Sequence, residues 1–387
     1  MTVTIRLPDD HGGLVDHELA APRYTDARGG GFTARVAYAA AHVVADPLGH
    51  NAPGAPAAVD WDTTLAFRHH LWGHGLGVAE AMDTAQRGMG LDWTATQELI
   101  RRSSAEARAV DGRIAAGAGT DHLDVDVRDL AAIRAGYEQQ LAVVEDAGAR
   151  PILMASRQLA ATAEGPDDYH RLYGDLLAQV STPVVLHWLG PMFDPALAGY
   201  WGAHDVEKAT DSFLALCTDH ADRIDGVKVS LLDADHEVAL RRRLPASVRC
   251  YTGDDFNYPT LIRGDEVGHS DALLGIFAAI APAAASALTA LDAGDLDGYE
   301  AAFAPTLPLA RHVFAAPTFH YKTGIAFLAW LSGHQDGFLM VAGQQAGRSV
   351  PDLVTTFRLA DAAGLFPDPV LAAHRMDRFL EVAGVAR

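Results

Sequence analysis

The chain alternates short apolar segments with longer stretches whose apolar residues recur every three or four positions. Short apolar runs bounded by turn-forming residues are typical of buried strands, whereas the three-to-four spacing is typical of amphipathic helices. Strands are predicted at 35–44, 78–82, 113–116, 151–155, 183–187, 226–230, 248–252 and 266–269. Helices are predicted between them, including 63–74, 93–108, 127–147, 167–180, 206–220 and 236–243. Eight successive strand–helix units predict an α/β fold, a (β/α)8 TIM barrel.

The two ends of the chain depart from this alternation. Residues 1–33 are rich in turn-forming residues and predict an N-terminal extension. After residue 283 only helical spacing remains, at 284–291, 296–310, 319–331, 350–363 and 369–382. We therefore expect an extension at 1–33, a barrel at 34–283, and a helical region at 284–387 that packs on the barrel.

Charge and composition narrow the expected partners. The chain has 30 basic and 50 acidic residues, a formal charge of −20. This excess repels phosphate backbones and anionic membranes, so neither is an expected partner. The two cysteines, Cys217 and Cys250, give no disulfide framework and no metal-ligand spacing. The first ten residues lack the pattern of a secretory signal, and no apolar stretch reaches membrane-spanning length. We expect a cytoplasmic protein that acts on a small molecule.

Lys228, inside the apolar segment 224–230, is the most unusual residue of the chain. Burial disfavours the ammonium form, and a neutral lysine can form a Schiff base with a carbonyl compound. The alternative is a lysine at a strand end that reaches water or pairs with a carboxylate. In such barrels the active site lies at the carboxyl ends of the strands. The residues predicted there include His42, Asp83, Thr84, Ser156, Arg157, His187, Asp254, Asp255 and His269.

Five short motifs, in chain order, resemble those of the dihydrodipicolinate synthase and N-acetylneuraminate lyase family. They are Pro183-Val184-Val185-Leu186-His187-Trp188, Gly226-Val227-Lys228-Val229-Ser230, Gly253-Asp254-Asp255, Gly268-His269-Ser270 and Tyr321-Lys322-Thr323-Gly324. The resemblance covers residues 34–335 and is that of a divergent branch. It implies a class I aldolase-like barrel whose imine-forming lysine is Lys228. It also implies a homo-oligomer, a dimer or tetramer, and we expect no cofactor and no metal.

The chain departs from the family at positions that carry chemistry. His187 stands in place of the strand-five acid/base tyrosine, and a histidine can transfer protons near neutral pH. The alternative is a core histidine hydrogen-bonded to the backbone. Of the family's Thr-Thr-Gly-Glu loop only Thr84 matches, and Arg87 could hold an anion or lie on the surface. Ser156 lies where the family has a Pro-Tyr-Tyr segment.

These observations favour a Schiff-base-forming lyase or aldolase, or a related hydro-lyase. Its expected substrate is a 2-oxo acid or a sugar-derived keto compound. The expected catalytic residues are Lys228 and His187. The expected substrate-binding residues are Thr84, Arg87, Ser156, Asp255 and His269. The sequence leaves open the substrate and whether the reaction cleaves, condenses or dehydrates.

Two other classes of protein stay open. A metal-dependent barrel aldolase or isomerase would take its ligands from strand ends. The candidates for that set are His42, Asp83, His187 and His269. His70 and His74 have a common ligand spacing, but no carboxylate completes a zinc-protease motif, so we expect a surface pair. A non-catalytic ligand-binding barrel would use Lys228 only in an ion pair.

Overall fold

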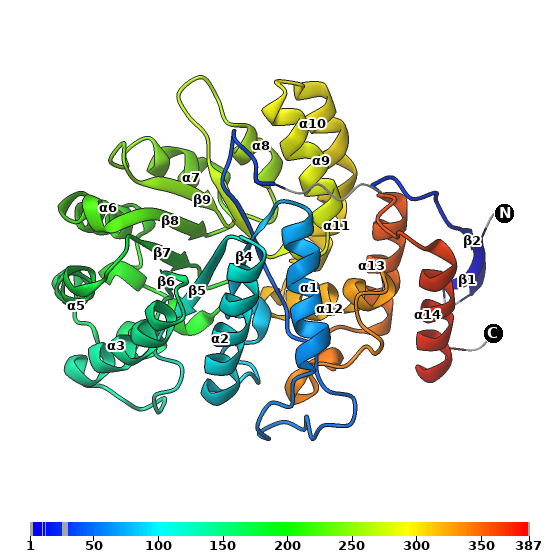
Figure 1. Ribbon diagram of the computed structural model, residues 1–387, viewed down its shortest axis with the longest axis horizontal. Helices are drawn as coiled ribbons and strands as arrows, with labels where there is room; N and C mark the ends of the chain where they lie inside the picture. Colours follow the sequence, from blue (N-terminus) through cyan, green and yellow to red (C-terminus); the bar gives the residue numbers. More distant parts are fainter. Residues whose placement is uncertain (1–2, 10, 12, 25–29, 386–387) are drawn as a thin grey trace.

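Eight parallel strands close into a barrel, as the sequence predicts (Figure 1). The computed structural model describes residues 3–9, 11, 13–24 and 30–385. Around the barrel the strands are ordered β10-β3-β4-β5-β6-β7-β8-β9. Their bounds are β3 Ala37–Ala40, β4 Gly77–Glu80, β5 Ile114–Ala118, β6 Arg150–Leu153, β7 Val184–Leu189, β8 Ile224–Ser230, β9 Arg249–Thr252 and β10 Asp271–Leu274. Each strand therefore pairs with its neighbours in chain order, and β10 closes the sheet on β3.

Helices cover the outside of the barrel. They are α1 Trp61–Gly73, α2 Trp93–Ala109, α3 Leu130–Asp146, α4 Arg157–Thr162, α5 Pro166–Gln179, α6 Val206–Asp219, α7 Ala234–Arg241, α8 Tyr258–Arg263 and α9 Ala281–Asp292. Aspartates begin many of them, since Asp60, Asp92, Asp129, Asp205 and Asp233 accept hydrogen bonds from the first turns of α1, α2, α3, α6 and α7. An aspartate at this position satisfies backbone N–H groups that have no partner within the helix.

Apolar side chains fill the middle of the barrel. This cluster includes Tyr38, Ala79, Ile152, Val185 and Tyr251. A Cβ at position 226 would lie 2.6 Å from the Tyr251 ring, so only glycine leaves room for that tyrosine beside β8. Because the middle is packed, space for a ligand remains only toward the ends of the strands.

The eighth strand lies further along the chain than the sequence pattern indicates. It is β10, Asp271–Leu274, and not 266–269. The segment before it is a turn, in which the Asp265 carboxylate accepts hydrogen bonds from the amides of Val267 and Gly268, at 2.9 and 3.0 Å. Val267 is 71% exposed, as expected for a turn and not for a barrel strand. His269 therefore precedes β10 and lies at the amino ends of the strands.

The rest of the chain forms a helical layer beside the barrel (Figure 1). Its helices are α10 Leu296–Phe303, α11 Leu307–Val313, α12 Tyr321–Leu331, α13 Val350–Ala362 and α14 Pro369–Val382. Every residue of α12 is buried, because this helix lies between the barrel and the outer helices. No helix in the described ranges is long and apolar enough to cross a bilayer.

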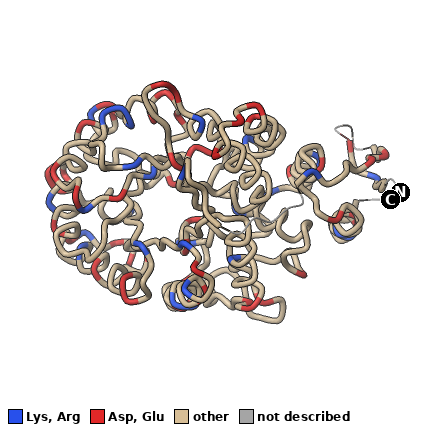
Figure 2. The backbone as a smooth tube through the Cα atoms, turned by 45° about the horizontal axis from the view of Figure 1, so that its top comes forward, with Lys and Arg blue, Asp and Glu red and all other residues tan. Residues whose placement is uncertain are grey.

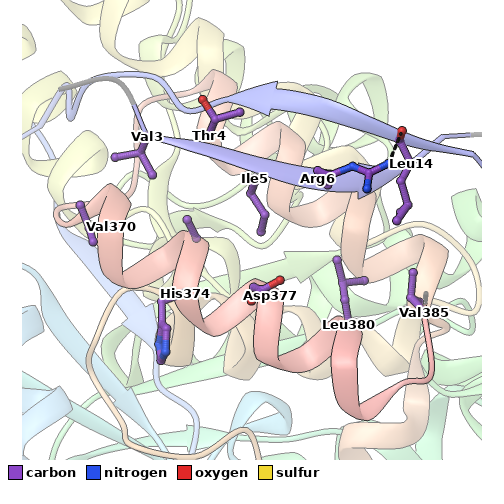
Figure 3. A pocket seen from close by; sticks show the side chains of 11 residues that line it. Val3, Thr4, Ile5, Arg6, Leu14, Val370, His374, Asp377, Leu380 and Val385 are labelled. Carbon is purple, nitrogen blue, oxygen red and sulfur yellow. Dashed lines mark hydrogen bonds between the residues drawn. The ribbon is translucent and has the colours of Figure 1, made fainter. Parts of the chain in front are cut away.

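Near the N-terminus the chain folds into an antiparallel hairpin, β1 Thr4–Pro8 with β2 Leu14–Glu18. Its His17 Nε2 lies 2.8 Å from an Asp361 carboxylate oxygen on α13. A groove of about 410 Å³ separates the hairpin from α14 and is lined by apolar side chains with Arg6, His374 and Asp377 (Figure 3). Figure 2 shows acidic and basic residues spread along the outer helices and loops of the barrel.

Candidate active site

Lys228 faces the interior of the barrel at the carboxyl end of β8. In the strand register it lies directly opposite His187 of β7 and Tyr251 of β9. Residues paired across neighbouring strands point to the same face of a sheet, and Tyr251 belongs to the interior cluster. Gly253 makes this orientation possible, because a Cβ there would lie 2.8 Å from Cε of Lys228. Lys228 is 8% exposed.

The surroundings of Lys228 favour its neutral form. Burial lowers the pKa of Lys228, and the charges of Asp83 and Asp255 act in the opposite direction. Burial also raises the pKa of Asp255 to about 8. The hydrogen bond that Asp255 accepts from the Ile276 amide, at 2.9 Å, and the charge on Lys228 both act to lower this pKa, but burial has the larger effect. Desolvation thus favours an uncharged amine beside an uncharged acid. An uncharged amine is the form that attacks a carbonyl carbon.

Lys228 lines a small inner chamber of about 10 Å³. Its walls also include Asp83, Thr84, Phe193, Ser230, Asp255 and Tyr321. An outer cavity of about 210 Å³ adjoins it and shares Asp83 and Leu189; it is also lined by His187, Arg87, Arg157 and Asp194. The inner chamber holds roughly one water molecule. A carbonyl substrate therefore needs side chains to move before it can reach the amine.

His187 lines the outer cavity and contacts Ser230, a residue of the inner chamber. Its Nε2 lies 3.2 Å from the Ser230 hydroxyl, and its Nδ1 is buried without a hydrogen-bond partner among the described residues. Burial, with the charge on Lys228, lowers the pKa of His187 well below its usual value. The imidazole is therefore neutral at pH 7 and can accept a proton. Its recorded partner is a hydroxyl of the site and not the backbone, unlike a core histidine.

Thr84 reaches the chamber from the turn after β4, and its hydroxyl lies 2.7 Å from that of Tyr321. Tyr321 is the first residue of α12, and burial raises its pKa well above the usual value. The tyrosine therefore stays protonated and can donate or relay a proton. Sequence reasoning missed Tyr321 as a site residue. The signal was its place in a family-like motif, but it follows no barrel strand.

Three of the predicted binding residues have other roles or positions. The Arg87 guanidinium is held by the Asp121 carboxylate, with Nε to Oδ2 at 2.8 Å, and by the carbonyls of Ala81 and Gly117 and the Gln140 side chain. Although Arg87 borders the outer cavity, its donors already have partners. This residue joins loops and is not a free anion-binding group.

Ser156 is the N-cap of α4, since its hydroxyl accepts a hydrogen bond from the Leu159 amide at 3.0 Å. Its own amide donates to the Tyr200 hydroxyl. The serine is 1% exposed and lines neither the chamber nor the outer cavity.

His269 lies at the other end of the barrel, in a depression with Arg241 and Arg249. The prediction that His269 joins this site is wrong, because its strand begins two residues later.

The structure does not bring together the candidate metal ligands that the sequence leaves open, which are His42, Asp83, His187 and His269. His42 Nε2 is 2.8 Å from the Gln335 side-chain oxygen, and His269 lies far from it at the amino ends of the strands. In the described ranges no group of three or more His, Cys, Asp and Glu residues could hold a metal ion. His70 and His74 are not a surface pair either, because His74 is buried and the His70 ring packs 4.1 Å from that of His334.

Solved structures of dihydrodipicolinate synthases share this architecture. The enzyme from Bacillus clausii aligns with a TM-score of 0.65 at 12% identity, over 85% of this chain and 97% of that chain. The enzyme from Bacillus anthracis aligns with a TM-score of 0.62 at 14% identity, over 85% and 98%. The 4-hydroxy-tetrahydrodipicolinate synthase from Methylacidiphilum fumariolicum aligns with a TM-score of 0.64 at 14% identity, over 91% and 99%. The fold is therefore that of the dihydrodipicolinate synthases, as the sequence resemblance implies, in a strongly diverged chain.

The chain also matches the sequence model of a defined protein family. Residues 5–385 match the family described as "Protein of unknown function (DUF993)", and the chain is a member of it. A comparison with curated proteins finds no match. The reaction must therefore be argued from the residues around Lys228.

Proposed function

We propose that this protein is a Schiff-base-forming lyase or aldolase, or a related hydro-lyase, that acts on a 2-oxo acid or a sugar-derived keto compound. The observation that carries the proposal is the position of Lys228. It is a buried amine at the carboxyl end of a barrel strand, next to a cavity, with its pKa lowered by desolvation. This is the environment that activates a lysine as a nucleophile.

In the proposed reaction the Lys228 amine attacks the substrate carbonyl carbon and forms a C–N bond. The resulting carbinolamine takes up a proton and loses water, which leaves an iminium ion. The iminium accepts the electron pair of the adjacent bond that breaks, and the same steps in reverse allow condensation. The enamine left by this cleavage takes up a proton on carbon and becomes an iminium again. Water then adds to the iminium carbon, the C–N bond breaks, a proton is released, and the free amine returns.

Three side chains of the site can move the protons in this proposal. His187 is neutral in the free site and can take the proton from a substrate hydroxyl as the carbon–carbon bond breaks. Tyr321 stays protonated and shares a hydrogen bond with Thr84, so it can supply a proton to the departing hydroxyl of the carbinolamine. Asp255, with its pKa raised to about 8, can return protons to Lys228.

Reductive trapping tests the proposal. Borohydride delivers hydride to the iminium carbon and leaves a stable secondary amine, which mass spectrometry detects as a covalent adduct. The chain contains three lysines, Lys208, Lys228 and Lys322, so peptide mapping assigns the site unambiguously. A panel of 2-oxo acids and keto sugars should label Lys228. Lys228→Ala and Lys228→Arg should abolish labelling, since a guanidinium stays protonated. Full activity in Lys228→Ala, with loss of activity on chelation, would contradict the proposal.

A further inference from the structure

A second lysine is buried beside the proposed site. Lys322 follows Tyr321 on α12 and is 3% exposed. Its Nζ lies 5.3 Å from the centroid of the Tyr321 ring. The hydrogen bond recorded for Nζ goes to the Met89 sulfur at 3.1 Å. A thioether is a weak acceptor, so this contact does not compensate a buried ammonium for its lost water.

Among the described residues, no carboxylate forms an ion pair with the Lys322 amine. Asp83 and Asp194 influence Lys322 through their charges, but in the described residues no ion pair within 4.0 Å joins Lys322 to either. Burial lowers the pKa of Lys322 to about 8, so the ammonium form still predominates at neutral pH. A buried cation without an anionic partner is destabilising. Within the part of the chain that the structure describes, the fold therefore holds a buried cation with no anionic partner at ion-pair distance.

The composition of the chain makes this position more unusual. Arginine accounts for 27 of the 30 basic residues, and lysine for three. In the described residues, the cation of every recorded ion pair is an arginine or a histidine, as in the pairs of Arg68, Arg157 and Arg241. Lys208 lies exposed on α6, whereas Lys228 and Lys322 are buried, on β8 and in the first turn of α12. Two of the three lysines are thus buried amines, whereas the recorded ion pairs use arginine or histidine as the cation.

Lys322 and Lys228 share a neighbour. The charge of Asp83 acts on both amines, and its side chain lines both the inner chamber and the outer cavity. Arg157, which also lines the outer cavity, adds positive charge near Lys322 while its Nε holds Asp194 at 2.5 Å. A ligand in these connected spaces would meet Lys228 in one part and the field of Lys322 and Arg157 in another.

We propose that Lys322 is a specificity-determining residue that binds an anionic group of the substrate, a carboxylate or a phosphate, while Lys228 takes the carbonyl. The Lys322 ammonium donates hydrogen bonds to the anionic oxygens in place of the Met89 sulfur. This inference rests on the proposed function, because it assigns the substrate class of the same site. It predicts that neutral ketones are poor ligands.

Paired probes test this assignment. The rate of borohydride trapping is measured for pyruvate against methyl pyruvate, and for dihydroxyacetone phosphate against dihydroxyacetone. The same ratio is measured for a simple amine in solution, and the protein's ratio is divided by it. This division corrects for the different intrinsic reactivity of the two probes toward amines. The wild-type protein should react faster with the charged member of one of the two pairs. The pair that shows this preference tells whether Lys322 binds a carboxylate or a phosphate. Lys322→Met should reduce that preference roughly ten- to a hundredfold, the usual effect of one charge-assisted hydrogen bond.

Controls separate charge from folding. Lys208→Met removes an exposed lysine and should leave the ratio unchanged, whereas Lys322→Arg should keep part of the preference. Lys322→Gln gives a second neutral variant, and thermal melting shows whether each variant folds. The inference is overturned if wild type shows no preference for either charged probe, a test that needs no variant. It is also overturned if Lys322→Met labels Lys228 with an unchanged ratio. Absence of labelling at Lys228 with any probe would instead refute the proposed function.

Discussion

The hydroxyl groups of Thr84 and Tyr321 lie 2.7 Å apart, although the two residues are separated by 237 positions in the chain. Thr84 belongs to the barrel and Tyr321 to the helical layer beside it. Both line the chamber that contains Lys228. The wall of the proposed active site is therefore built jointly by the barrel and by α12.

Tyr321→Phe should slow turnover roughly 10²–10⁴-fold, the usual range for a lost acid/base group, because the hydroxyl that supplies the proton is removed. Labelling of Lys228 should persist at a reduced rate. The matched control is Tyr258→Phe, which breaks another buried tyrosine–threonine hydrogen bond, to Thr306 at 2.5 Å, outside the chamber. Equal effects of the two variants on turnover would show that Tyr321 acts only through packing.

His187→Ala should leave reductive labelling of Lys228 intact and lower turnover roughly 10²–10⁴-fold. The reason is that imine formation needs the lysine, whereas the later proton transfer needs a base. His187→Tyr, which introduces the residue of the resembling family, should retain part of the activity. Steady-state rates and adduct masses measured on the same preparations separate the two steps. Loss of labelling in a folded His187→Ala protein would contradict this division.

Asp255→Asn should shift the pH profile of Lys228 labelling to lower pH. The Asp255 charge raises the pKa of Lys228, so its removal lets burial lower that pKa further. Because burial raises the pKa of Asp255 to about 8, its charge is present mainly above that pH, so labelling should become faster there and stay nearly unchanged near pH 6. The amide oxygen can still accept the hydrogen bond from Ile276, which limits structural damage. Asp235→Asn, at an exposed position on α7, should leave the profile unchanged.

Phe193→Ala should accelerate labelling of Lys228 several-fold. Phe193 lines the inner chamber and packs edge-on against Phe314 and Tyr321, with ring centroids 6.4 and 6.1 Å apart. The chamber of about 10 Å³ is too small for a ketone, so side chains that line it, Phe193 among them, must move before the substrate enters. The substitution should increase the rate of labelling more for larger carbonyl probes than for small ones. A uniform gain for all probes would argue against a steric gate.

Arg87→Met should lower the free energy of unfolding by about 1–3 kcal/mol, because it removes the partner of the Asp121 carboxylate and the hydrogen bonds to the Ala81 and Gly117 carbonyls. Burial raises the pKa of Asp121, but Arg87 and Gln140 bring it down to about 2. This pair therefore stabilises the fold above pH 4, and its contribution disappears as the pH falls toward 2. The variant should lose less stability over that window in chemical denaturation. An unchanged unfolding curve, with loss of ligand binding, would restore the anion-binding interpretation.

The barrel could be predicted because each strand is a short apolar run and each helix has its own spacing. The eighth strand was misplaced because the apolar run 271–288 contains a strand, a turn and a helix without a polar break, while Val267 imitates a strand residue on an exposed turn. The positions of Lys228 and Asp255 follow from strand ends alone. Tyr321 and Lys322 could not be placed in this way, because they reach the site from a helix whose docking depends on tertiary packing.

Helix α12 also separates two properties that evolution can change independently. The amine that we propose forms the bond belongs to β8, beside the packed apolar interior of the barrel. The group that we propose to recognise the anionic part of the substrate, Lys322, lies in the first turn of α12, which follows the barrel in the chain. Replacement of that one side chain could redirect the site to another ketone while Lys228 and the groups proposed to move protons are kept.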